Sequence, residues 1–318
     1  MATSPFDRVQ WYALLEQTGI HPLIITAEDE NGSAALPLTQ TAGRITPMRN
    51  WYSFFWRQIA PEGETGDRLL AAMARHLRGR AHRITFAPVP EEDRSATRLS
   101  QAFAKAGWRV EVTRCDTNHI LKVQDRSFAQ YWSDRPGKLR TTLKRKAKKV
   151  EVVIHQSFDP QAWQAYENIY DASWKPTEGE PEMLRAFAKE EGAAGRLRLA
   201  IAYHEEEPIA AQFWTVEAGT AFIHKLAHLE SHRKLSAGTT LTAALFERVI
   251  EQDNVQLVDF GTGNESYKSD WMEETRPRYQ IDCLNMSRPA AWVDLARLAL
   301  RRSRQEDVPA LASRPEAG

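Results

Sequence analysis

The chain has 318 residues, of which 42% are apolar and 26% are charged, and its 42 basic and 42 acidic side chains give a formal net charge of +0. This length suits one large domain or two of ordinary size. The balanced charge argues against a dedicated nucleic-acid binder, which usually carries a basic excess over its whole domain. No stretch reaches the ~20 consecutive apolar residues that cross a bilayer.

Neither the N-terminus nor the cysteines indicate export. The first residues, MATSPFDRVQWYALLEQ, lack a basic segment followed by an apolar run. The two cysteines, Cys115 and Cys283, make no disulfide framework and no metal motif. We therefore expect a reducing, cytoplasmic setting.

The first half of the chain predicts a hairpin followed by alternating helices and strands. The hairpin joins residues 20–28 and 34–40 through the turn DENGS, and a third strand lies within 43–56. Next in order are a helix over 66–79, a strand over 82–89, a helix over 94–106 and strand signals over 108–123.

The second half predicts a similar order. It has helices over 163–175 and 181–192, strands over 196–203, 208–217 and 221–229, a helix over 239–253, and strands over 255–260 and 276–286. The order hairpin, strand, helix, strand thus occurs twice, which indicates a duplicated α+β unit with mixed sheets flanked by helices. Chance similarity is the alternative, because many α/β proteins share this order.

The segment RKLSAGTTL joins a strand to an amphipathic helix and suits phosphate binding. A helix N-terminus presents free N–H groups and a partial positive charge, and small residues let a pyrophosphate approach them. An ordinary helix cap explains the same residues. The candidate cofactor-binding residues are Arg233, Leu235, Ser236, Ala237, Gly238, Thr239 and Thr240.

Arg233-x-x-Ser236-x-Gly238 resembles the Arg/Gln-x-x-Gly-x-Gly/Ala motif with which GNAT acyltransferases hold the pyrophosphate of acyl-CoA. Over residues 126–288, the segments RPGKLRTTLKRKAKK, YDASW, RKLSAGTTL and DFGTGNESYKSDW are similar in type and order to CelD/BcsL-type acetyltransferases, a GNAT branch related to the FemAB transferases. Serine replaces the first glycine of the motif, which puts a positive-φ loop conformation in doubt.

The resemblance implies tandem GNAT-like domains, with a degenerate copy over 1–125 and an acyltransferase domain over 126–288. In the first copy Glu62, Glu64 and Asp67 stand where the helix begins, and such acids repel a pyrophosphate. We therefore expect one cofactor site, for acetyl-CoA or another acyl-CoA, and no metal.

The segment KLRTTLKRKAKKV (138–150) is strongly basic. Leu139, Leu143, Ala147 and Val150 share one face of a helix, and seven bases cover the other faces. A solvated helix surface explains most of these bases. The functional alternative is attraction of an anion such as CoA, a nucleotide-linked sugar or tRNA, which FemAB-like relatives use as donor.

Acyl transfer needs a base, oxyanion donors and an acid for the leaving thiolate. GNAT enzymes often use a tyrosine shortly after the fifth strand as the acid, and by resemblance Tyr267 is the candidate. Asp259, Glu265 and Lys268 lie near it in the sequence and would act as base, as acceptor-binding group or in structure only.

His224, His228 and His232 are spaced by four residues. On a strand, at about 3.3 Å per residue, the first two would be roughly 13 Å apart, too far to share a metal ion. Phe222, His224, Leu226 and His228 would then share one face. His224 is therefore a candidate base, and a hydrogen-bonded structural histidine is the alternative.

Two aromatic residues and the C-terminal segment complete the candidates. Tyr170 and Trp174 would line the acceptor cleft or belong to the core. Residues 289–304 form a basic amphipathic helix that would touch a membrane surface or pack on the protein body or a partner. The polar tail, 305–318, is expected to be disordered.

The sequence therefore predicts an acyltransferase that moves an acyl group, first of all acetyl, from acyl-CoA to a small amine or a sugar hydroxyl. By resemblance the acceptor would belong to polysaccharide or envelope biosynthesis. One alternative is a FemAB-like transferase that uses aminoacyl-tRNA, although no stable nucleic-acid complex is expected. The other is a non-catalytic GNAT-fold binding module.

Overall fold

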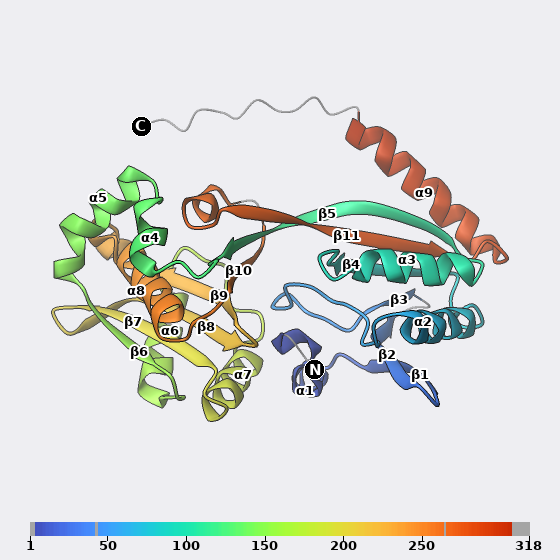
Figure 1. Ribbon diagram of the computed structural model, residues 1–318, viewed down its shortest axis with the longest axis horizontal. Helices are drawn as coiled ribbons and strands as arrows, with labels where there is room; N and C mark the ends of the chain where they lie inside the picture. Colours follow the sequence, from blue (N-terminus) through green and yellow to red (C-terminus); the bar gives the residue numbers. More distant parts are fainter. Residues whose placement is uncertain (1–3, 42–43, 264, 307–318) are drawn as a thin grey trace. The chain divides into compact units, whose positions relative to one another are not determined.

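The computed structural model describes residues 4–41, 44–263 and 265–306. The chain forms two compact units, coloured along the sequence in Figure 1. Unit 1 comprises Met1–Ile20, Met48–Trp56 and Cys115–Arg278, and unit 2 comprises His21–Pro47, Arg57–Arg114 and Tyr279–Gly318. The predicted boundary between the two copies lies at residue 125. Unit 1 nevertheless includes two N-terminal segments from before this boundary.

Unit 1 is built on a mixed sheet with the strand order β5-β10-β9-β8-β7-β6. All neighbouring strands are antiparallel except β9 and β10, which run parallel. The strands are β5 (Arg109–Lys122), β6 (Glu151–His155), β7 (Leu197–His204), β8 (Glu207–Glu217), β9 (Thr220–His228) and β10 (Leu257–Thr262).

Helices cover both faces of this sheet. On one face, side chains of α1 (Val9–Gln17), α6 (Pro160–Asp171) and α7 (Pro181–Ala193) share a core with the sheet that includes Trp163 and Phe213. On the other face, α4 (Phe128–Ser133) and α8 (Ala237–Glu251) form a second core that includes Trp214 and Phe246. Unit 1 is therefore a three-layer sandwich with its largest side chains buried on both sides of the sheet.

Unit 2 has a mixed sheet with the order β1-β2-β3-β4-β11. Its elements are β1 (Pro22–Asp29), β2 (Gly32–Thr41), β3 (Arg44–Pro47), α2 (Glu64–Leu77), β4 (Arg83–Val89), α3 (Ser95–Lys105), β11 (Glu274–Leu284) and α9 (Pro289–Glu306). Only β3 and β4 run parallel.

Apart from the extra strand β6, the strand orders of the two units correspond, and their mixed strands with flanking helices confirm the predicted α+β fold class. In each, two hairpins are followed by a helix that leads into a parallel strand, and an antiparallel strand completes the sheet. The antiparallel strand at the end of each copy belongs to the sheet of the other copy. The end of the first copy, β5, pairs with β10 in unit 1, and the end of the second copy, β11, pairs with β4 in unit 2.

Several boundaries differ from the predicted ones. The third strand, Arg44–Pro47, lies within the predicted 43–56, whereas α1, α4 and β6 were not predicted. The C-terminal helix continues to Glu306, two residues into the predicted tail, whereas residues 307–318 lie outside the described residues. No helix in the described ranges is long and apolar enough to span a membrane.

Candidate functional site

The candidate phosphate loop lies at the N-terminus of α8. A short 3-10 helix, η3 (Glu230–Leu235), ends at Ser236, which adopts φ +52° and ψ +40°. Serine therefore takes the left-handed conformation that usually favours glycine. The Thr239 and Thr240 amides bond to the Ser236 carbonyl, so the amides of Ala237 and Gly238 come before the first helical hydrogen bonds.

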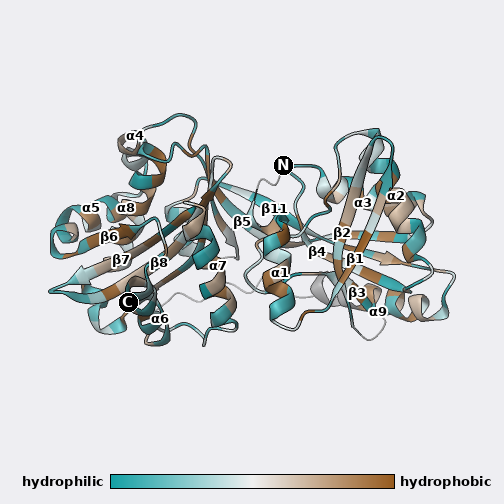
Figure 2. Cartoon of the chain, turned by 90° about the horizontal axis from the view of Figure 1, so that it is seen from below, coloured by the Kyte–Doolittle hydropathy of each residue, from teal (hydrophilic) through white to brown (hydrophobic). Residues whose placement is uncertain are grey.

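The basic segment meets this loop. It forms α5 (Gly137–Lys146) and a 3-10 turn, η2 (Ala147–Lys149), and α5 packs on α8. Lys146 Nζ donates a hydrogen bond to Ser236 Oγ at 2.9 Å. Figure 2 shows α5 as mainly hydrophilic, and none of its residues is buried. A positive surface therefore adjoins the helix N-terminus.

Gly238 leaves room beside the loop. A Cβ there would lie 3.8 Å from His228 Nδ1, an ordinary contact. Arg233 is exposed, and Thr240 Oγ1 is buried without a hydrogen-bond partner in the described part of the chain. The loop can thus present backbone amides, a hydroxyl and cationic side chains to a phosphate.

Strands β9 and β10 pair only at their start. Their parallel partners are Leu257 with Thr220, Val258 with Ala221, and Asp259 with Phe222. Beyond these residues, the described part of the chain pairs β9 with β8, and a register shift lies between Phe213/Lys225 and Trp214/Ile223. This β-bulge inserts His224 as an extra residue. Phe222, His224, Leu226 and His228 therefore do not follow the predicted alternation.

His224 packs in an aromatic cluster. Its ring lies 5.0 Å from that of Phe213 and 5.3 Å from that of Phe187, and Nε2 is 2.8 Å from Thr215 Oγ1. Burial lowers the pKa of His224 to about 3, with a smaller effect of the Lys225 charge. Because a histidine with this pKa takes up a proton poorly at neutral pH, the geometry does not favour His224 as the base.

The bulge brings Lys225 into a polar cluster that the sequence analysis did not identify. Lys225 Nζ is 2.8 Å from Glu178 Oε1 and 3.5 Å from the Tyr170 hydroxyl. The Tyr52 hydroxyl donates to Glu178 Oε1 at 2.6 Å. Tyr170 is a buried member of the hydrophobic core, and its hydroxyl borders the cluster of Tyr52, Glu178 and Lys225. No motif marks these three, because they come from three distant segments.

The loop after β10 carries Glu265, Tyr267 and Lys268. Lys268 is buried and bonds to the Thr262 carbonyl and to Glu265. Burial alone would raise the pKa of Glu265, but the hydrogen bond and charge of Lys268 hold it below its usual value. Tyr267 is 39% exposed, and burial of its hydroxyl raises its pKa to about 12. Tyr267 therefore keeps its proton at neutral pH.

Asp259 has a structural environment. It is buried and accepts hydrogen bonds from Asn118 Nδ2 at 2.6 Å and from the Gly261 amide at 2.7 Å. Burial raises its pKa. These contacts fix β10 to β5 and leave Asp259 badly placed for a substrate.

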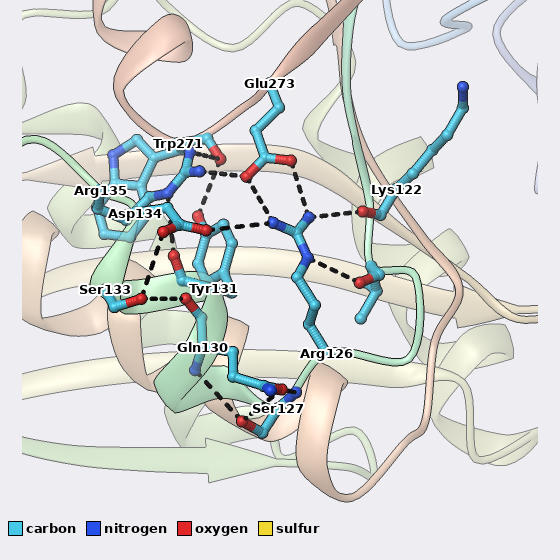
Figure 3. Close-up of polar contacts among 11 residues, drawn as sticks. Lys122, Arg126, Ser127, Gln130, Tyr131, Ser133, Asp134, Arg135, Trp271 and Glu273 are labelled. Atoms are coloured by element: carbon cyan, nitrogen blue, oxygen red, sulfur yellow. Dashed lines mark hydrogen bonds and ion pairs between the residues drawn. The ribbon is translucent and has the colours of Figure 1, made fainter.

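An ionic cluster holds the end of this loop (Figure 3). Glu273 pairs with Arg126 at 2.8 Å and with the buried Arg135. Arg135 also donates to the Trp271 carbonyl, and its guanidinium lies over the Tyr131 ring. Residues 271–273 are thus tied to α4, which limits the freedom of the preceding loop.

Trp174 and Lys175 connect the two parts of the site. The Trp174 ring lies 4.3 Å from that of His228, which borders the loop at Gly238. Burial lowers the pKa of Lys175, and the charge of Lys225 adds to this effect. The Trp174 ring therefore lies on the side of the loop at Gly238, whereas the Lys175 side chain is close enough to Lys225 to feel its charge.

No group of histidine, cysteine, aspartate and glutamate residues in the described ranges could hold a metal ion. His228 and His232 instead lie near Glu230 and Glu207, respectively.

The family comparison covers much of unit 1. Residues 137–269, which include α5, β9, α8 and the loop after β10, match the family model described as acetyltransferase (GNAT) domain. This part of the chain has the GNAT fold.

Solved structures share the fold over nearly the whole chain. The C-terminal DUF2156 domain of an Agrobacterium fabrum protein described as a lysylphosphatidylglycerol synthetase has a TM-score of 0.60 at 15% identity and covers 92% of each chain. L-PGS from Bacillus licheniformis has a TM-score of 0.59 at 14% identity and covers 95% of this chain and 99% of its own. FemX has a TM-score of 0.61 at 10% identity and covers 88% and 92%.

These identities show the fold alone. None of the curated proteins matches the sequence. The GNAT part of the sequence-based resemblance is thereby supported, and the CelD/BcsL branch remains a proposal.

Proposed function

We propose that this protein is an acyltransferase that moves an acyl group, first of all acetyl, from acyl-CoA to a small amine or a sugar hydroxyl. The observation that carries the proposal is the left-handed Ser236 at the N-terminus of α8. The motif has glycine at this position, and Ser236 adopts the left-handed backbone conformation that glycine favours. The amides of Ala237 and Gly238, which precede the first helical hydrogen bonds of α8, and the adjacent Lys146 suit a pyrophosphate.

The roles of the other residues follow from where they lie. The cofactor would contact Arg233, Leu235 and Ser236–Thr240, with Trp174 beside them. Tyr267 would protonate the leaving thiolate, because it is partly exposed and holds its proton. Tyr170 and Lys268 would border the acceptor. A saccharide acceptor from envelope or polysaccharide synthesis belongs to the same proposal.

Calorimetry with acetyl-CoA tests the donor. We expect micromolar binding by the wild type and loss of binding in Gly238→Glu, which puts a carboxylate at the helix start. Gly238→Ala is the matched control, because its Cβ makes only an ordinary contact. Absence of binding by the wild type, or equal binding by Gly238→Glu, would contradict the proposal.

A second donor, aminoacyl-tRNA, is favoured by the basic helix α5 beside the loop. The fold shared with lysylphosphatidylglycerol synthetase and FemX is compatible with this alternative. It predicts retention of tRNA that weakens steeply with salt and no binding of acetyl-CoA. Filter binding at two salt concentrations distinguishes the two donors.

A further inference from the structure

The inner face of the C-terminal helix α9 is held by unit 2. Asp294 is 2% exposed, and its carboxylate lies 3.2 Å from His82 Nε2. Ala291, three residues earlier, is fully buried. Just before the helix, Arg288 donates a hydrogen bond to the Gly79 carbonyl at 2.6 Å. These contacts fix the position of α9 on one side only.

The outer face of α9, formed by Trp292, Val293, Ala296 and Leu300, is apolar and exposed. Trp292 is 60% exposed, Val293 52% and Leu300 63%. Trp292, Ala296 and Leu300 are spaced by four residues, so they form one stripe along the helix, and Val293 lies beside it. Trp292 Nε1 already donates to the Met286 carbonyl at 3.1 Å. The exposed ring therefore presents apolar surface, and the outer face extends over about two turns of the helix.

Basic side chains border the outer face. The Arg297 side chain is 64% exposed and lies 3.5 Å from the Asp294 carboxylate. The same carboxylate lies 3.9 Å from the guanidinium of Arg44, which is also largely exposed. The sequence of residues 289–304 holds four arginines and one acidic residue, the inward-facing Asp294. The charge beside the outer face is therefore positive, although the whole chain has a formal net charge of +0.

We propose that the outer face of α9 binds the surface of an anionic lipid bilayer. A helix of this kind lies in the plane of the interface, with its apolar side chains among the acyl chains and its arginines at the phosphate groups. Tryptophan is enriched at this depth of a membrane. The contact is peripheral, since no helix in the described ranges is long and apolar enough to cross a bilayer. This inference goes beyond the proposed function, because it concerns a surface of unit 2 and depends on neither donor nor acceptor.

Charge favours a lipid surface over a second copy of the chain. A symmetric contact between two outer faces would repeat the same basic border, with Arg297 and Arg44, on both sides, and like charges oppose such a contact. Lipid phosphates instead pair with guanidinium groups. Because unit 2 already fixes α9, docking on a bilayer needs little further ordering of the helix.

Flotation of the full chain with lipid vesicles tests the apolar part of the surface. We expect the wild type to float with phosphatidylglycerol vesicles and to stay unbound with phosphatidylcholine vesicles. Trp292→Ser should lower the partition coefficient about tenfold. Trp51→Ser, which removes an 87% exposed tryptophan from unit 1, is the matched control and should bind like the wild type.

Two outcomes of the flotation experiment would overturn the proposal. One is a wild type that stays unbound with phosphatidylglycerol vesicles. The other is equal binding by the wild type and Trp292→Ser, because another basic surface, such as α5, would then hold the lipid.

Arg297→Gln tests the basic border of the surface. We expect the partition coefficient on phosphatidylglycerol vesicles to fall about fivefold at low salt, and the difference from the wild type to shrink as added salt screens the lipid charge. Arg109→Gln is the control, because Arg109 is also in unit 2, exposed and paired with a carboxylate. An equal loss in both variants would mean that net charge alone drives binding and would overturn a specific docking face.

Trp292→Phe guards against a folding defect, since it keeps an aromatic ring on the outer face. We expect it to bind vesicles within about threefold of the wild type, and Trp292→Ser to unfold within about 2 °C of the wild type, because the side chain is mostly exposed. Sedimentation velocity without vesicles tests the second copy as occupant. A wild-type dimer that Trp292→Ser dissociates would overturn the lipid surface.

Discussion

Lys146 at the end of α5 donates a hydrogen bond to Ser236 Oγ at the start of α8, with an N–O distance of 2.9 Å. Ninety residues of sequence separate these two side chains. The contact joins the most basic segment of the chain to the loop proposed to hold the phosphates of the donor. The basic segment and the phosphate loop are therefore parts of one surface.

Replacing Lys146 should weaken donor binding. In Lys146→Met the loop loses a cation that can turn from Ser236 to a phosphate, and we expect the Kd of acetyl-CoA to rise about tenfold, or ~1.4 kcal/mol. Lys138→Met, at the exposed start of the same helix, is the control and should stay within twofold. Equal Kd values for the two variants by calorimetry would exclude a specific role for Lys146.

The left-handed conformation of Ser236 predicts an order of stability. A side chain at this φ costs about 1 kcal/mol that glycine avoids. Ser236→Gly should therefore unfold in urea with a free energy about 1 kcal/mol higher than Ser236→Ala, and the general preference for glycine over alanine at a helix N-cap acts in the same direction. Equal stability of the two variants would show that the loop relaxes away from φ +52°.

His224 should make the protein less stable in acid. Its pKa is about 3 in the folded state and ~6.5 when unfolded, so the unfolded chain binds the proton first as the pH falls. The contribution of His224 to the free energy of unfolding is complete above pH ~6.5. It is lost progressively as the pH falls to ~3, by up to ~1.4 kcal/mol per pH unit. Because the residue as a whole is intermediate in exposure, we expect about 2 kcal/mol in total.

Urea unfolding at pH 7 and pH 4 measures this effect against His224→Gln, which does not titrate in this range. The wild type should lose more stability than the variant over the interval. The same loss in both proteins would mean that other groups cause the acid sensitivity.

Tyr267→Phe tests whether the site is catalytic. If Tyr267 protonates the leaving thiolate, its removal should lower kcat about 100-fold, within the usual range for acid catalysis, and leave the Kd of acetyl-CoA unchanged. A thiol-release assay with an acceptor amine measures the first quantity and calorimetry the second. Bound ligand without turnover in the wild type would instead support a non-catalytic binding module.

The sequence by itself determined the elements whose signals are local. Helical spacing at Leu241, Leu245 and Val249 predicted the helix that became α8, and turns between apolar runs predicted β7, β8 and β9. The repeated order of elements predicted two copies of one α+β unit. These features depend on periodicity and turn chemistry, which neighbouring residues fix among themselves.

Only the tertiary structure decided how those elements combine into a site. The exchange of β5 and β11 between the sheets depends on pairing between distant strands. The β-bulge at His224 depends on the register between β8 and β9, and it turned Lys225 toward Glu178 and Tyr52. Sequence periodicity assumes an unbroken alternation, so one extra residue was enough to change which side chains of β9 share a face.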